Sequence, residues 1–386
     1  MKQETITDGH WSRRQREWAA FGVFAIMLLA TSGARAEPYL AIQEGYKCSK
    51  CHVNMTGGGK RTDFGNIYVQ TRLANKFLDW RGLFDDEEEL DEDNPIGTDS
   101  RSSFFTGRLN DYISIGGDLR MRYERTDTPS SPTQDVFNQS KQNLYLEINL
   151  IPEHVTFYQT LAGGGDAREI FGLLKWNSFY VKAGEFFLPY GLRLLDDSAV
   201  TRAVTGFTYG TTDAGVEIGY EPDHWAVHLA ATNGTGASLE NNRNKRLTAS
   251  LAYVRKGFRV GGSFSTNKDS QGVETIIYGL HGGAQLGRVG ILAAVDIIDD
   301  STDKESVAIL EFNLLLSRGN NLKFSYEYHD PSDVIGQNAR DRFSLVWEPF
   351  LNQFTQFRAG ARENRGIPQS DAQNQTEYFL EVHLFL

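Results

Sequence analysis

Five consecutive residues, Cys48-Ser49-Lys50-Cys51-His52, carry the clearest chemical signal in this sequence. Their pattern, C-x-x-C-H, is the attachment signature of c-type haem. The two thiols of such a motif bond covalently to the haem, and the adjacent imidazole binds the iron as its proximal axial ligand. Cys48 and Cys51 are also the only two cysteines among 386 residues. The motif therefore predicts one covalent haem c on Cys48 and Cys51, with His52 bound to the iron.

A C-x-x-C pair on its own has two other uses. It can form a redox-active dithiol or disulfide, and it can supply half of a zinc site. A zinc site would need a second pair of Cys or His ligands nearby, and residues 53–110 contain neither residue type. Haem is the favoured interpretation, and both alternatives stay open on the sequence.

The first 36 residues are typical of an export signal. Three arginines form a basic start, and the apolar run Trp18–Ala30 is too short to span a bilayer. The small-x-small motif Ala34-Arg35-Ala36 then predicts a mature chain that begins at Glu37. Export is consistent with a haem that is attached outside the cytoplasm.

Hydrophobicity alternates with a period of two from residue 110 onward, in segments of roughly ten residues. In the last segment, Glu377–Leu386, every second residue is apolar. This pattern predicts an all-β transmembrane barrel of about sixteen antiparallel strands, in contact with outer-membrane lipid. Fourteen or eighteen strands, or a soluble β-sandwich, are the alternatives.

The formal net charge of −11 argues against a nucleic-acid partner.

The connections between these segments alternate between short and long. Short ones, such as residues 151–153 and 349–352, are expected on the periplasmic side. The longest internal connection, residues 188–212, occupies the position of the porin loop that folds into the lumen. Its Asp196 and Asp197 could bind a cation such as iron, although a solvated turn is the plainer interpretation.

The chain thus divides into a signal peptide (1–36), a haem segment (37–84), an acidic linker (85–109) and a barrel (110–386). A short helix is expected at Tyr68–Leu73. The carboxylate run Asp85–Asp93 is expected to be extended because like charges repel. A docking site for a basic periplasmic cytochrome is the alternative use of that run.

An electron-transfer haem usually has a second axial ligand, Met or His. Met55 lies only three residues after His52 and would meet the same side of the ring. The candidates for the opposite side are His383, which should face the lumen, and His154 in the first short turn. A five-coordinate haem is also open. Three further histidines fall on inward-facing positions, namely His228, His281 and His329.

Residues 41–52 (AIQEGYKCSKCH), the glycines that follow and Asp63-Phe64-Gly65 resemble the start of the fused monohaem cytochrome c–porins. The resemblance implies an outer-membrane protein with one haem c on Cys48, Cys51 and His52, followed by a barrel of about sixteen strands. The best-known members of that family are oxidases of extracellular ferrous iron. Beyond the N-terminal segment, the barrel matches only in its pattern.

The predicted function is electron transfer across the outer membrane, between an extracellular donor or acceptor such as iron and a periplasmic c-type cytochrome. Whether the chain is itself an iron oxidoreductase is left open. One alternative is a diffusion porin whose haem segment is a plug or sensor, and another is a barrel partner of separate multihaem cytochromes.

Six arginines are expected in the lumen, where they could raise the haem potential or select anions, namely Arg120, Arg122, Arg259, Arg342, Arg358 and Arg362.

Overall fold

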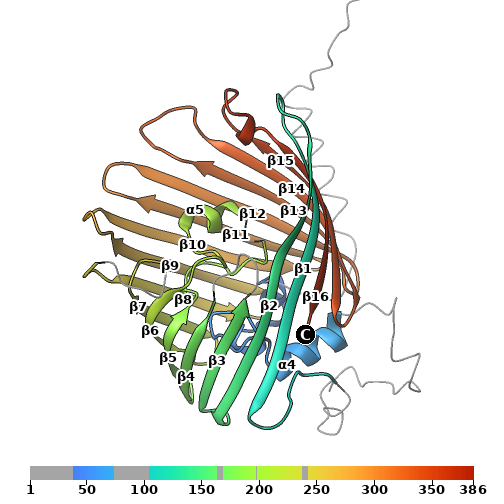
Figure 1. The fold of residues 1–386 in the computed structure, drawn as a ribbon, viewed down its shortest axis with the longest axis vertical. Helices are drawn as coiled ribbons and strands as arrows, with labels where there is room; N and C mark the ends of the chain where they lie inside the picture. Colours follow the sequence, from blue (N-terminus) through green and yellow to red (C-terminus); the bar gives the residue numbers. More distant parts are fainter. Residues whose placement is uncertain (1–37, 74–103, 163–167, 197, 237–241) are drawn as a thin grey trace, which may run out of the picture.

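The chain folds into a closed antiparallel β-barrel in which the first strand pairs with the last (Figure 1). The computed structural model describes residues 38–73, 104–162, 168–196, 198–236 and 242–386. Sixteen strands form the barrel, which confirms the predicted fold class. The strands are β1 (Ile113–Asp127), β2 (Gln134–Ile151), β3 (Val155–Ala162), β4 (Ile170–Trp176), β5 (Phe179–Phe186), β6 (Asp213–Tyr220), β7 (Trp225–Thr232), β8 (Arg246–Arg255), β9 (Phe258–Lys268), β10 (Glu274–Leu286), β11 (Val289–Asp299), β12 (Lys304–Ser317), β13 (Asn320–Asp330), β14 (Arg340–Asn352), β15 (Thr355–Arg365) and β16 (Thr376–Phe385).

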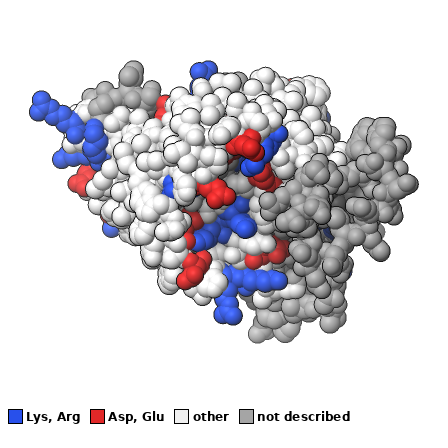
Figure 2. All heavy atoms as spheres, turned by 90° about the horizontal axis from the view of Figure 1, so that it is seen from below, with Lys and Arg blue, Asp and Glu red and all other residues white. Residues whose placement is uncertain are grey.

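Alternation along each strand separates an apolar outer face from a polar inner face. In β7, Leu229 is 57% exposed whereas its neighbour Ala230 is 5% exposed. Large apolar side chains dominate the exposed positions of the strands, which is the surface that lipid covers in such barrels. Seen from below, basic and acidic side chains are interspersed, and neither sign forms a continuous patch (Figure 2).

Buried ion pairs fill much of the lumen. Arg358 lies 2.8 Å from Glu348 and 2.9 Å from Glu381, and Lys182 lies 2.9 Å from Glu217. The predicted inward arginines do face the lumen, and most of them pair with carboxylates there. Pairing leaves these arginines less able to act as an anion filter.

The N-terminal segment lies inside the barrel, at the end with the short turns. It forms α2 (Pro38–Glu44), α3 (Cys48–Cys51), α4 (Asp63–Tyr68) and the π-helical turn η2 (Val69–Leu73). The helix predicted at 68–73 therefore starts earlier, at Asp63, where the Thr62 hydroxyl caps it by accepting a hydrogen bond from Gly65 N (3.1 Å). The predicted export signal and the carboxylate run Asp85–Asp93 lie outside the described residues. In the part of the chain that the structure describes, no helix is long and apolar enough to cross a membrane.

Residues 187–212 fold inward and contain α5 (Val200–Thr205). The Tyr190 hydroxyl donates a hydrogen bond to Asp296 of β11 (2.8 Å), and the Val200 amide donates one to Glu327 of β13 (2.6 Å). These contacts hold the connection against the far wall, where the sequence had predicted an inward loop. One further short element, the 3-10 turn η5 (Asp371–Gln373), lies in the loop before β16.

Candidate functional site in the barrel lumen

The C-x-x-C-H motif is built as one helical turn closed by a tight loop. In α3 the His52 amide donates a hydrogen bond to Cys48 O (3.0 Å), so both cysteines and the histidine surround the same turn. The loop then returns to pair His52 with Arg61, and Thr62 N bonds to Cys51 O (3.0 Å). This closure fixes the motif as a rigid unit without any help from a disulfide, because both cysteines are free thiols.

Three consecutive glycines make the closure possible. Gly57, Gly58 and Gly59 have φ of 94°, 80° and 64°, a region that other residues rarely adopt. A Cβ atom on Gly59 would also lie 2.4 Å from the Tyr158 hydroxyl oxygen on β3. The glycine run therefore lets the loop turn sharply and approach the barrel wall.

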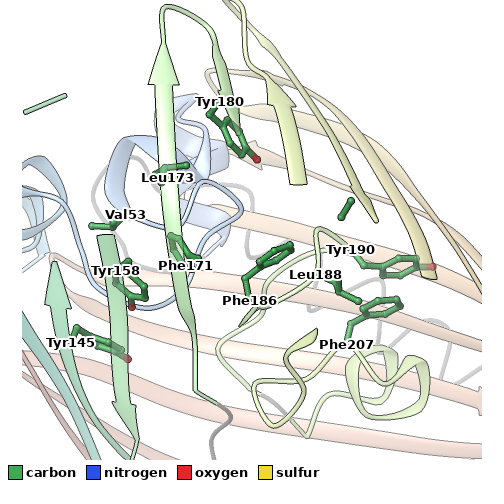
Figure 3. Packing of buried hydrophobic residues seen from close by; sticks show 11 residues of the cluster. Val53, Tyr145, Tyr158, Phe171, Leu173, Tyr180, Phe186, Leu188, Tyr190 and Phe207 are labelled. Atoms are coloured by element: carbon green, nitrogen blue, oxygen red, sulfur yellow. The ribbon is translucent and has the colours of Figure 1, made fainter. Parts of the chain in front are cut away.

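Buried polar contacts dock this loop on the wall formed by β3 to β5. The Asn54 amide donates to Glu169 (2.6 Å) and accepts from Lys182 (3.1 Å). Lys60 N donates to the Tyr158 hydroxyl (3.1 Å). Val53 packs into an apolar cluster whose side chains come mainly from this wall and the inward loop (Figure 3).

The remainder of the segment contacts two other walls and one turn. Tyr39 and Ile42 of α2 pack with Leu292 and Ile309 of β11 and β12. Ser49 donates to Glu221 in the β6–β7 turn (2.6 Å). Residues 68–73 meet the wall near β14 and β16 through the cluster of Tyr68, Val69, Leu73, Phe350 and Phe385. Anchoring on three walls places the motif across the lumen.

A cavity of about 210 Å³ lies beside the motif. Cys48, Cys51 and His52 all border it, as does the stretch 189–193 of the inward loop. The barrel wall contributes polar side chains, namely His228, Arg259, His281, Gln356 and His383.

Burial sets the ionisation of the motif. It lowers the pKa of His52 to about 4, with nearby Arg61 acting in the same direction, so the imidazole is neutral at pH 7. Burial also raises the pKa of the Cys51 thiol to about 12, and the neighbouring Cys48 adds to this. A neutral imidazole is the form that binds a metal. The described residues contain no group of three or more His, Cys, Asp or Glu side chains placed to hold a metal ion.

The cavity also contains buried polar atoms that lack partners. Among the described residues, none hydrogen-bonds to His52 Nδ1, Arg259 Nε or Gln356 Nε2. Arg259 is also close to the motif, with its Nη1 4.0 Å from Cys48 Sγ. Free thiols, a neutral imidazole and an unpaired guanidinium nitrogen of Arg259 around the cavity fit a haem c, whose propionates are anionic.

The structure brings His383 but not His154 to the cavity. His154 is exposed in the β2–β3 turn, with Nδ1 3.0 Å from Lys175 O, so its placement argues against a role as iron ligand. His383 lines the cavity, and its two ring nitrogens lie 3.1 Å from Gln356 and 2.9 Å from Asp118. Met55 packs in the apolar cluster and does not line the cavity.

Asp196, one of the two acidic residues singled out in the inward loop, contributes to the fold of that loop. Asp196 forms an ion pair with Arg362 and accepts a hydrogen bond from the Ser198 hydroxyl (2.7 Å). Its partner Asp197 lies outside the described residues. Through these contacts Asp196 stabilises a turn and anchors the inward loop to β15. They give no support to the cation site that the sequence suggested at Asp196.

Two cavity residues were missed by sequence reasoning as part of the site. Arg193 lies in the inward loop and borders the cavity beside the motif. Its position in a loop of the length that enters porin lumens was the only available signal. His281 was recognised as inward-facing, but its lack of a partner depends on neighbours that the sequence does not reveal.

No protein-family model and no curated protein matches the sequence. The fold is similar to that of solved outer-membrane barrels. A loop-deletion mutant of OmpT from Vibrio cholerae matches with a TM-score of 0.55 and 13% identity, over 71% of this chain and 99% of that one. An anion-selective porin from Comamonas acidovorans matches with a TM-score of 0.54 and 10% identity, over 71% and 99%. OmpF of Salmonella typhi, in complex with daunomycin, matches with 0.53 and 12%, over 71% and 97%. At these identities the likeness establishes a porin-like barrel fold.

Proposed function

We propose that this chain is an outer-membrane protein that holds one covalent haem c in its lumen. It would pass single electrons between an extracellular donor or acceptor, such as ferrous iron, and a periplasmic c-type cytochrome. The observation that carries the proposal is the position of the motif, because Cys48, Cys51 and His52 border one cavity inside a membrane-spanning barrel. The export signal in the first 36 residues would bring the chain to this compartment.

The segment lies at the end of the barrel that should face the periplasm. Its contacts are with short turns: the Gly257 amide of the β8–β9 turn donates to Ile42 O (2.7 Å), and Arg318 of the β12–β13 turn donates to Thr71 O. Short turns are periplasmic in outer-membrane barrels. A periplasmic redox partner could therefore approach the motif directly.

The chain's own residues would bind the cofactor and set its electrostatic environment. Cys48 and Cys51 would form the thioether bonds, and His52 would bind the iron as a neutral imidazole. Arg193 and Arg259 border the cavity and would supply positive charge for the anionic propionates. Positive charge near the haem would favour the reduced, less positively charged centre and so raise its potential. The bound haem would supply a one-electron Fe(III)/Fe(II) couple.

A diffusion porin remains the second candidate, because the solved structures that resemble this chain include porins. At the level of the fold, those comparisons favour this function over electron transfer. The N-terminal segment and the inward loop both occupy the lumen, so in this case they would form a plug.

Proteoliposomes can separate the two functions. Vesicles would carry the purified protein and an internal pool of reduced methyl viologen, and ferric citrate would be added outside. Electron transfer predicts rapid oxidation of the internal dye by the haem-loaded protein. The double variant Cys48→Ala/Cys51→Ala should lose covalent haem and this oxidation, while heat-dependent migration on gels verifies that its barrel is folded.

Two results would reject electron transfer. One is dye oxidation at the parental rate in the double variant. The other is swelling of vesicles in sugar solutions without dye oxidation, which would instead establish the diffusion porin. A reduced-minus-oxidised spectrum of the purified parent provides the first check, because the proposal requires a c-type haem signal.

A further inference from the structure

One buried imidazole in the cavity has no hydrogen-bond or ion-pair partner among the described residues. His281 lies in the middle of β10, is 6% exposed, and lines the cavity beside the motif. No hydrogen bond or ion pair joins its ring to any residue in the described part of the chain. Buried polar side chains are normally hydrogen-bonded. An imidazole without such a partner is therefore a candidate to bind a ligand in the cavity.

The other two histidines of the barrel wall at the cavity are already engaged. His228 has Glu221 at 2.9 Å from Nε2 and Ser250 at 3.1 Å from Nδ1. His383 has Asp118 and Gln356 at similar distances. Either ring would have to give up an existing polar contact to bind a metal, whereas His281 would not.

A glycine on the neighbouring strand makes room for the His281 ring. A Cβ atom at Gly261 of β9 would lie 2.7 Å from His281 Nε2, so a larger residue there would displace the imidazole. Two residues before Gly261 on the same strand is Arg259, whose guanidinium approaches Cys48 Sγ. The unpartnered ring is therefore close to the part of the wall that contacts the motif.

His281 and His52 also reach the cavity from different walls. The loop after His52 is anchored on β3 to β5 through Asn54 and Lys60. β10 lies five strands beyond β5 around the closed barrel. Two axial ligands must approach opposite faces of a haem ring, and side chains from separate walls can satisfy this requirement.

We propose that His281 is the second axial ligand of the haem iron, opposite His52. This inference rests on the proposed function, because it requires that the motif carries a haem. The imidazole would donate a nitrogen lone pair to the iron, and no bond in the protein would break. Two histidine ligands would give a six-coordinate, low-spin centre whose potential is lower than that of a His/Met centre.

The test is the spin state of the purified, haem-loaded protein, read by visible absorption and electron paramagnetic resonance. The parent should be low-spin. His281→Ala should retain covalent haem, measured by pyridine haemochromogen, and become high-spin; added imidazole should restore the low-spin spectrum. His329→Ala is the matched control, because His329 is lumenal but pairs with Glu305 outside the cavity, and it should stay low-spin.

Low-spin haem in His281→Ala, or conversion to high spin in His383→Ala or His228→Ala instead, would overturn the assignment while leaving the proposed function intact. A parent protein without covalent haem would reject the proposed function itself. If the alanine variant fails to fold, His281→Met is the second test. It should stay six-coordinate with a midpoint potential shifted to more positive values, and an unchanged potential would count against His281.

Discussion

At the scale of single residues, a few buried polar groups hold the motif in the lumen. Asn54 is fully buried and hydrogen-bonds both Glu169 and Lys182, which belong to the wall. Burial raises the pKa of the Glu169 carboxyl, while Lys182 opposes that rise. Such a network stabilises docking only while every member keeps its partners.

Replacement of Asn54 by Leu should loosen the segment without unfolding the barrel. Each buried group left unpaired costs about 1–3 kcal/mol, and Glu169 and Lys182 keep other partners, so we expect a loss of about 2 kcal/mol. That loss corresponds to about thirty-fold in the docking equilibrium. Proteolysis of residues 38–73 should accelerate accordingly when opening is faster than cleavage.

The matched control for this experiment is Arg108→Ala. Arg108 and Asp63 form an ion pair at 2.9 Å whose side chains are 49% and 38% exposed. Exposed pairs contribute about 0–1 kcal/mol, so proteolysis should barely change. Equal acceleration in both variants would show that the buried network does not hold the segment.

At the scale of elements, the strands could be predicted, whereas the contacts that dock the motif in the lumen could not. Alternation in β13 and β16 follows directly from contact with lipid on one side and a polar lumen on the other. One expected turn was wrong: residues 349–352 still belong to β14, because Pro349 sits at the strand end opposite Asn320 and Phe350 N bonds to Gly319 O (2.6 Å). Local pattern identifies strands, whereas docking depends on contacts between residues far apart in the chain.

The same limit applies to the candidate site. Cys48, Cys51 and His52 were identified because their spacing is itself the signal. The alternation of apolar and polar residues in β16 places His383 in the lumen. Its contact with Asp118, however, depends on the pairing of β1 with β16. That the His281 ring has no hydrogen-bond partner among the described residues likewise depends on which side chains lie opposite it. The spacing of residues along the sequence does not reveal those neighbours.

The anchor of the inward loop gives a prediction about pH. Burial alone would raise the pKa of Asp196, but Arg362 and other guanidinium groups hold it well below its usual range. A carboxyl with a lowered folded-state pKa stabilises the fold above its unfolded pKa, about 3.9, and loses this contribution only as pH falls through the lowered value. Ion conductance in planar bilayers should therefore stay low and constant from pH 7 to about pH 4.

Arg362→Met should raise that conductance already at pH 7, because the loop loses its main charge partner. A parent channel that opens between pH 7 and pH 4 would show that another group controls the loop. Lys245→Met offers a control for the loss of one positive charge, since Lys245 is exposed in the loop between β7 and β8.

At the scale of the whole molecule, the outer surface and the filled lumen impose opposite requirements on neighbouring residues. The apolar belt of such barrels is about 25 Å tall, and the cost of a charge in it depends on depth. Leu229 lies near the middle of β7 and points outward, next to the lumenal His228. The chain therefore needs strict alternation to stay in the membrane and to keep its polar interior.

Replacement of Leu229 by Arg tests this arrangement. A cation near the bilayer midplane costs about 2–4 kcal/mol. The variant should unfold from lipid vesicles at a lower urea concentration, measured by tryptophan fluorescence. Val334→Arg provides the matched control, because Val334 is 74% exposed in the long loop between β13 and β14, and the same change there should have little effect. If both variants unfold together with the parent, the outer face of β7 is not in contact with lipid, and the barrel would have to cross the membrane in another register.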